Sequence, residues 1–223
     1  MSLGLVINSR RVVVPGVNVV TWLDDAKSAP KITDGRPRGT PPTAVVLHTS
    51  RGKRGNVQPG SKPSTRAELL ARYQARTERQ VSWHLTIDTD GDTFQQEDLS
   101  AWMAWHVEEA NGHTVGIELV QHPDSGDLWQ VQLDACVQVV TAICDTLSIP
   151  KRVPTDGEGA PWSKPVPAWV MRKYHGPGQK WPGVLGHRHL VPDTVRGPGD
   201  PGDAIFRALL KAGFEAYDVT ARA

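Results

Sequence analysis

Apolar and polar residues follow two different periods along this chain, which predicts a domain built from both strands and helices. The unbroken apolar runs AVVL (44–47) and TVGIELV (114–120) are typical of buried strands. The segments VSWHLTID and DTFQQ, with the turn sequence TDGD between them, predict a hairpin over 81–96. VLGH predicts another strand, on which His187 and His189, two residues apart, would face the same side.

Apolar residues at helical spacing predict three helices between and after these strands. A helix over 65–79 would begin after Ser64 as its N-cap and carry an apolar stripe at Leu69, Leu70 and Tyr73. Another closes the domain at GDAIFRALLKAGF. The strongest signal lies over 128–149, where one face holds Leu133, Val137, Val140, Ile143 and Leu147. Strands and helices intermix, so the class is α/β or α+β with one mixed sheet.

Turn-rich segments divide the chain into three parts. Residues 1–40 predict a short strand pair or arm followed by a linker, residues 41–214 the main domain, and residues 215–223 a C-terminal tail. Within the domain, residues 150–183 form an insertion rich in Pro, Gly and Trp, and long loops of this kind often carry function. The tryptophans of the insertion suggest a surface for stacking on sugars or contacting peptides.

Composition excludes several classes of protein. Lys and Arg number 25 against 24 Asp and Glu, and no basic run is present, so we expect no nucleic-acid partner. No apolar stretch is long enough for a membrane span, and the first residues lack the pattern of a cleaved signal, which predicts synthesis in the cytoplasm. Cys136 and Cys144 are eight apart on the predicted helix, about 12 Å, too far for a disulfide. A reducing compartment fits them.

Five residues are candidates for a catalytic or metal-binding site: four at a strand end or in a loop, and one within a strand. His48 ends the AVVLH strand, and His187, His189 and Asp200 lie in GHRHLVPDTVRGPGDPG. Glu118 interrupts an apolar strand, which is costly unless its carboxyl is paired or lies near a cation. A buried salt bridge would explain Glu118, and a structural role would explain His48. Together with one of the two loop histidines and Asp200, they would instead make a catalytic zinc site with three ligands and a base.

The segments VVLHTS, VSWHLTIDTDGDTFQQEDLSAWMAWHV, TVGIELV and GHRHLVPDTVRGPGDPGDAIF, in this order, resemble the zinc-dependent N-acetylmuramoyl-L-alanine amidases. That family shares the fold of T7-type lysozyme, the recycling amidases and the peptidoglycan recognition proteins. The resemblance covers about residues 43–210. It implies a single domain with a central mixed β-sheet flanked by helices. It also implies hydrolysis of the amide between N-acetylmuramic acid and L-alanine, with peptidoglycan or muropeptides as the partner.

The resemblance assigns a role to each candidate. His48, His187 and Asp200 match the three ligands, implying one Zn²⁺ per chain, and Glu118 matches the carboxylate that activates the water. His189 would then support the site or be exposed.

Three departures from the family pattern affect the expected site. Relatives place a lysine two residues before the aspartate, where this chain has Pro198, so we expect Arg196 to stabilise the oxyanion. Trp83 stands where some branches carry a tyrosine, which leaves the proton transfer to Glu118 and makes His84 structural. The third departure concerns an AWH segment: Trp105 and His106 match it and would contact substrate, but the AG that follows in relatives is absent.

The resemblance leaves the biological role open. We favour a phage or prophage endolysin that acts on the cell wall after release at lysis, because of the tryptophan-rich insertion. A cytoplasmic enzyme that trims recycled muropeptides is the alternative. Two further hypotheses are a peptidoglycan-binding protein without activity and an unrelated metallohydrolase that uses His187 and His189 together. We expect a monomer.

Overall fold

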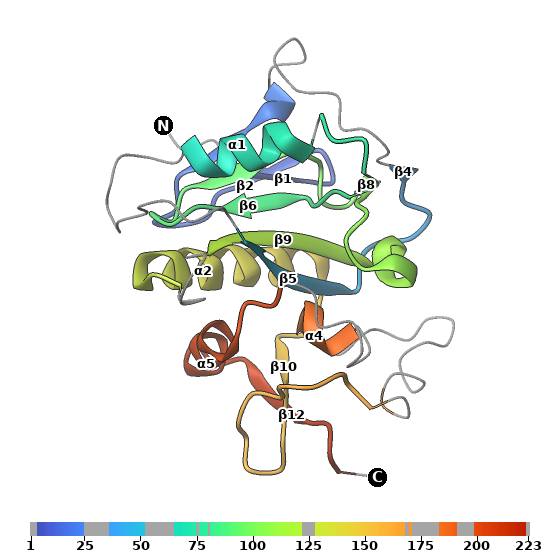
Figure 1. Ribbon diagram of the computed structural model, residues 1–223, viewed down its shortest axis with the longest axis vertical. Coiled ribbons are helices and arrows are strands. Elements are labelled where there is room, and N and C mark those ends of the chain that lie inside the picture. The colour runs from blue at the N-terminus through green and yellow to red at the C-terminus, as the bar shows by residue number, and fades with distance from the viewer. Residues whose placement is uncertain are drawn as a thin grey trace.

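A six-stranded mixed sheet forms the centre of the molecule, as seen in a computed structural model (Figure 1). The structure describes residues 4–24, 36–51, 65–74, 76–79, 81–121, 128–167, 170, 183–190 and 199–221. The strand order is β11-β5-β9-β6-β7-β3, and all neighbours are parallel except β6 and β7. The predicted mixed α/β architecture with flanking helices is therefore confirmed.

Strands and helices are interspersed along the chain. The strands are β1 (Leu5–Ile7), β2 (Arg10–Val12), β3 (Val19–Thr21), β4 (Arg36–Pro37), β5 (Ala44–Arg51), β6 (Leu85–Ile87), β7 (Thr93–Gln95), β8 (Trp102–Met103), β9 (Thr114–Gln121), β10 (Arg152–Thr155), β11 (Val184–Gly186) and β12 (Glu215–Asp218). The helices are η1 (Trp22–Asp24), α1 (Thr65–Gln74), η2 (Glu108–His113), α2 (Gln130–Leu147), α4 (His187–Leu190) and α5 (Asp203–Lys211). The predicted hairpin and the strands over 44–47 and 114–120 are present.

The two faces of the sheet differ in polarity at β5 and β9: one face is apolar, and the other carries polar groups. Side chains alternate between the two faces along each strand. Val45 and Leu47 of β5, with Ile117 of β9, join the main core, to which α2 contributes Leu133, Val139, Val140 and Ile143. Ala44 and Val46 face the other way into a smaller cluster. His48, two residues beyond Val46, therefore lies on the face opposite α2.

Helix α1 packs on the sheet through small residues, which differs from the predicted stripe. Ala67 and Ala71 are buried, whereas Leu69 and Tyr73 are 61% and 47% exposed. The two alanines let the helix lie close to β6 and β7, where larger side chains would hold it off. The proposed N-cap, Ser64, lies outside the described residues.

The segment before residue 24 is built into the same core. Leu5, Ile7, Val14, Val17 and Val19 are buried with the residues of the central sheet. β3 pairs with β7 at the edge of the sheet, and the side chain of Gln95 bonds the backbone of Val6 in both directions, each at 2.7 Å. The predicted strand pair is β1 and β2. The domain boundaries at residues 40 and 214 stay a prediction.

The C-terminal part closes against the insertion. β12 pairs in parallel with β10, so the segment predicted as a tail binds the start of the 150–183 insertion. A small cluster of Val166, Val170 and Val219 packs there with Trp162. Both cysteines are buried free thiols on α2. Within the described ranges no helix combines the length and apolarity needed to cross a bilayer.

The burial of the N-terminal segment predicts its effect on stability. Ile7 is 1% exposed, whereas Val13 is 72% exposed. Ile7→Ala should lower the free energy of unfolding by about 2–5 kcal/mol, as large-to-small substitutions in cores do. Val13→Ala is the matched control and should change it by less than about 0.5 kcal/mol. Urea unfolding measures both. Equal effects of the two substitutions would show that this segment is not part of the core in solution.

Candidate metal centre

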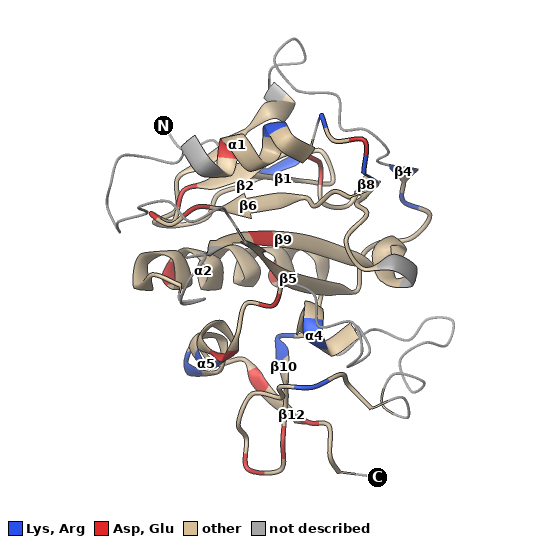
Figure 2. Ribbon diagram, viewed as in Figure 1, with Lys and Arg blue, Asp and Glu red and all other residues tan. Residues whose placement is uncertain are grey.

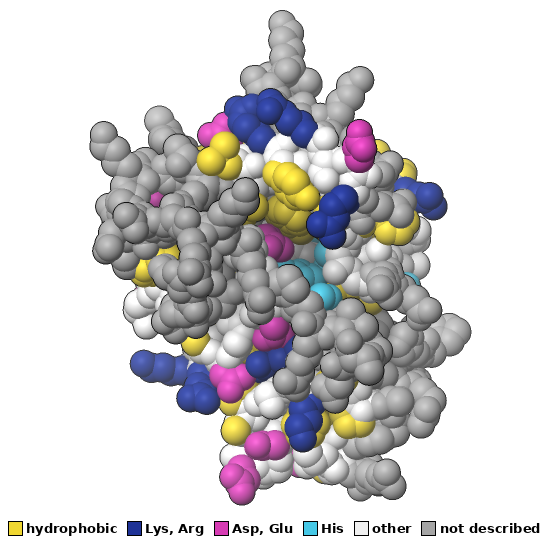
Figure 3. All heavy atoms as spheres, in the orientation of Figure 1, with side chains coloured by type: hydrophobic (Ala, Val, Ile, Leu, Met, Phe, Trp, Pro, Cys, Tyr) yellow, Lys and Arg dark blue, Asp and Glu magenta, His cyan; other side chains and the backbone are white. Residues whose placement is uncertain are grey.

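The candidate site lies on one face of the sheet, where β11, β5 and β9 run side by side. His48 and Glu118 lie within β5 and β9, and His187 directly follows β11. The expectation that His48 ends its strand is wrong, because β5 continues to Arg51. The strand register sets the arrangement: His48 of β5 is paired with Glu118 of β9, and Glu118 with Thr86 of β6. Gly186 of β11 pairs with Leu47, so His187 follows directly at the level of His48. In Figure 2 the acidic residue of β9 stands in an otherwise uncharged strand. Figure 3 shows histidine side chains together in a hollow on this face, beside an acidic group.

His48 and His187 lie side by side. Their ring centroids are 5.2 Å apart with an angle of 44° between the planes. His48 is 6% exposed, and burial, followed by the neighbouring His106 and His187, holds its pKa well below 6.5. The imidazole is therefore neutral at pH 7, which is the form that binds metal ions.

Asp200 reaches the same place through its backbone. Thr49, next to His48, donates its amide to the carbonyl of Gly199 and its hydroxyl to that of Asp200, at 2.9 and 3.1 Å. A Cβ built on Gly199 would lie 3.4 Å from Nδ1 of His187. The carboxylate accepts the amides of Arg188 and Gly202 at 3.0 and 2.9 Å.

Two imidazoles and a nearby aspartate side chain are a donor set that suits zinc. His48 and His187 lie side by side, and Asp200 would have to turn its carboxylate toward them, away from the two amides and from the Arg188 guanidinium, which lies 3.5 Å from Oδ1. Across the described residues, no group of three or more His, Cys, Asp and Glu side chains is already arranged to hold a metal ion. The three-ligand set therefore stays a prediction.

Glu118 is the carboxyl group nearest in the sheet to His48. Its side chain is partly exposed and makes no hydrogen bond or ion pair with any residue that the structure describes. Burial raises the pKa of Glu118 to about 8. The alternative explanation for this residue, a buried salt bridge, has no partner in the described part of the chain.

His106 and Trp105 border the site. His106 Nδ1 lies 2.9 Å from His48 Nε2, and its Nε2 lies 3.0 Å from the Thr114 hydroxyl. Both ring nitrogens thus already face protein groups, and the predicted contact of His106 with substrate stays a prediction. The Trp105 ring is partly exposed beneath the guanidinium of Arg36, which is 5.3 Å from the ring centroid.

His84 and His189 have structural roles, because both rings are hydrogen-bonded to backbone groups. His84 accepts the Gly116 amide at Nδ1, and burial with nearby Arg38 lowers its pKa to about 3. His189 accepts the Gly186 amide at Nδ1 and donates from Nε2 to the Trp162 carbonyl at 2.7 Å. The strand ends at Gly186 and His187–Leu190 is a helical turn, so the prediction that His187 and His189 face the same side of a strand is wrong. Both ring nitrogens of His189 are already hydrogen-bonded, which also disfavours a metal site shared with His187.

Several predicted residues fall outside the described ranges. Arg196, Pro198, Trp169 and Trp181 are among them, so the cation expected near the oxyanion has no described position.

Two residues of the site were missed in the sequence. Thr114 bonds His106, and Gly116 leaves room for the His106 ring, since a Cβ at Gly116 would come within 2.8 Å of it. The signal was available in TVGIEL, because alternation along a strand places Thr114, Gly116 and Glu118 on one face.

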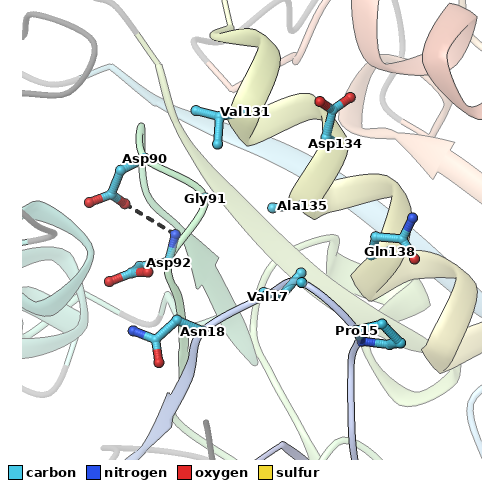
Figure 4. A pocket seen from close by; sticks show the side chains of 11 residues that line it. Pro15, Val17, Asn18, Asp90, Gly91, Asp92, Val131, Asp134, Ala135 and Gln138 are labelled. Carbon is cyan, nitrogen blue, oxygen red and sulfur yellow. Dashed lines mark hydrogen bonds between the residues drawn. The ribbon is translucent and has the colours of Figure 1, made fainter. Parts of the chain in front are cut away.

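A separate pocket lies away from the histidines. About 500 Å³ in volume, it is bordered by the loop at 15–18, the hairpin turn at 90–92 and residues 131–138 of α2 (Figure 4). The aspartates of the turn and of α2 line it, and Asp90 accepts the amide of Asp92 at 3.1 Å. No described histidine or cysteine lines this pocket.

A family model described as N-acetylmuramoyl-L-alanine amidase matches residues 38–203, and the chain belongs to that family. This is the family that the sequence motifs indicated. A search of curated proteins found no match.

Solved structures share the fold. An endolysin amidase from Clostridium intestinale has a TM-score of 0.52 at 12% identity, covering 91% of this chain and 99% of its own. The endolysin of bacteriophage Ph2119 of Thermus scotoductus has a TM-score of 0.52 at 15% identity, covering 88% and 99%. Drosophila PGRP-LB has a TM-score of 0.51 at 16% identity, covering 89% and 95%.

The raised pKa of Glu118 predicts how stability depends on pH in the metal-free protein. The carboxyl titrates near 4.5 when unfolded and near 8 when folded. Between these values the folded state holds more protons than the unfolded state, so stability falls as pH rises and the loss is complete above about 8. Glu118→Gln should remove this part of the fall, on the order of a few kcal/mol. Unfolding at a series of pH values measures it.

Glu158→Gln is the control for that experiment, since Glu158 lies on an exposed turn. It should leave the slope of stability against pH as in the wild type. A Glu118→Gln protein with the wild-type slope would show that the pKa of the Glu118 carboxyl is not raised in the folded protein.

Proposed function

We propose that this chain is a zinc-dependent amidase that hydrolyses the bond between N-acetylmuramic acid and L-alanine in peptidoglycan. The observation that carries the proposal is the Glu118 carboxyl, unpaired within the described structure and next to His48 in the sheet. A carboxyl kept off other protein groups is available to exchange protons with a substrate. Family membership supplies the reaction.

The residues divide the chemistry between them. His48, His187 and Asp200 would hold the zinc, and when bound the ion supplies Lewis acidity that polarises a water and the scissile carbonyl. Glu118 takes a proton from the attacking water and gives it to the leaving amine of L-alanine. Arg196 is our candidate for stabilising the charge that develops on the carbonyl oxygen, because Pro198 stands where relatives have lysine.

We infer that the enzyme acts as an endolysin. Two of the solved structures with this fold are described as endolysins. The tryptophan-bearing insertion is also joined to the segment that follows β11, since the Trp162 carbonyl accepts from His189. The alternative is a recycling amidase. Comparing rates on intact wall sacculi and on soluble anhydro-muropeptides separates the two roles, and a strong preference for the soluble substrate would reject the endolysin.

The ligand assignment predicts a contrast between two neighbouring histidines. His187→Ala should lose bound zinc and activity together while remaining folded. His189→Ala should melt earlier, because it strands the Gly186 amide and the Trp162 carbonyl, yet keep about one zinc per folded chain. Metal analysis and thermal melting measure both. Zinc retained by His187→Ala and lost by His189→Ala would reverse the assignment.

Glu118→Gln tests the reaction itself. The amide keeps the shape of the carboxyl but accepts no proton, so kcat should fall by about 10²–10⁴ while zinc content and binding to purified wall persist. The assay follows new L-alanine amino groups released from peptidoglycan. A wild-type protein that binds wall and releases none would identify a binding protein instead, and near-normal turnover by the variant would remove Glu118 from the mechanism.

A further inference from the structure

A chain of hydrogen bonds runs from the backbone carbonyl of Ala110 to the Nε2 atom of His48. The Thr114 hydroxyl donates to the Ala110 carbonyl at 2.9 Å. His106 Nε2 lies 3.0 Å from the Thr114 oxygen, and His106 Nδ1 lies 2.9 Å from His48 Nε2. Three side chains from three segments are thereby joined in one line.

The first bond of this line decides the position of every proton in it. The hydroxyl of Thr114 has one proton, which goes to the Ala110 carbonyl, so its oxygen must accept from His106. His106 therefore carries its proton on Nε2 and has a lone pair on Nδ1. That lone pair accepts from His48, which must carry its proton on Nε2. Nδ1 of His48 is left with a free lone pair.

We propose that Thr114 and His106 are positioning residues that hold His48 in the Nε2–H form and so present its Nδ1 to the metal ion. The inference rests on the proposed zinc site and adds to it the device that orients one ligand. Metal-bound histidines commonly donate their other ring N–H to a protein group that fixes tautomer and ring orientation. Here that group is a second imidazole, itself fixed by a threonine.

The surroundings keep the chain rigid. Thr114 is fully buried and Ala110 is 5% exposed, so little water competes for these bonds. The His106 ring lies against Gly116, whose missing side chain leaves the space that it fills. The Asn111 side chain accepts the amides of His106 and Val107, both at 2.8 Å, and fixes the backbone behind the ring. Burial holds the pKa of both His48 and His106 well below 6.5, consistent with two neutral rings.

The tautomers are measured directly by NMR of the metal-free protein with ¹⁵N-labelled histidine. Long-range ¹H–¹⁵N correlations at neutral pH distinguish a protonated Nε2 from a protonated Nδ1. The signals are assigned by their loss in His48→Asn and His106→Asn. We expect both rings to be protonated on Nε2. A His48 ring protonated on Nδ1 would overturn the proposal, whether or not the protein binds zinc.

Zinc affinity, measured by competition with a chelator, tests the consequence. Thr114→Val keeps the shape and the backbone carbonyl but removes the hydroxyl acceptor, so the tautomer of His106, and with it that of His48, is less firmly fixed. We expect zinc affinity to fall about 10–100-fold, the usual effect of losing such a partner. Thr114→Ser keeps a hydroxyl and should bind zinc nearly as the wild type does. Unchanged affinity in Thr114→Val would overturn the orienting role.

His106 provides a second matched pair. In His106→Asn the amide oxygen falls near the former Nδ1 and still accepts from His48, whereas His106→Leu offers no acceptor. We expect zinc affinity to be retained in the first and reduced in the second, with both proteins folded by circular dichroism. Equal loss in both variants would show that the ring matters only for packing, and would overturn the proposal.

The two levels of inference fail differently. If wild-type protein binds zinc and cleaves peptidoglycan, but Thr114→Val binds zinc equally well, the orienting device is wrong and the proposed function stands. If the wild type binds no zinc and releases no L-alanine, the proposed function fails and the orienting role with it.

Discussion

The parallel pairing of β5 with β9 is the constraint on which the rest of the structure depends. One register sets His48 beside Glu118 and, one residue earlier, Leu47 beside Ile117. The first pair faces the site and the second fills the core against α2. Because side chains alternate along a strand, a slip of one residue would put the carboxyl into the core and the leucines into water. The energy that holds the sheet together therefore also holds the candidate catalytic groups in place.

Burial has opposite effects on the charge of the two kinds of group in the site. It disfavours the protonated imidazole, which leaves the histidines neutral, and it disfavours the ionised carboxyl, which raises the pKa of Glu118 to about 8. A site with neutral rings and a largely uncharged carboxyl costs little to bury when empty. A bound cation would reverse the second effect by favouring the carboxylate. A bound metal ion would thus favour the ionised form of Glu118, which is the form that can act as a base.

Much of the fold was predictable from the sequence because its signals are local. Two buried strands are predicted by their own apolar runs, AVVL and TVGIELV. The hairpin is predicted by its turn sequence, TDGD. The buried face of α1 could not be predicted in this way. Whether Ala67 and Ala71 or Leu69 are buried depends on how closely the helix approaches the sheet. The turn at His187 likewise depends on the bond between Gly186 and His189, which no periodicity reveals. In the site, motifs indicated His48, Glu118 and His187, but the contacts of Thr114 and Gly116 with His106 appear only when the strands are assembled.

The order of the strands in the sheet also governs when a working site comes into existence. β11 pairs with β5 but follows it far downstream in the sequence, so this pair cannot form until the residues between the two strands have been made. Parallel pairs of this kind form slowly, because the long loop between them must close before any contact rewards it. A ribosome delivers His48 and Glu118 early and His187 late. The second imidazole, and with it the means to hold a metal, is therefore added only after the strands that carry His48 and Glu118 have been made.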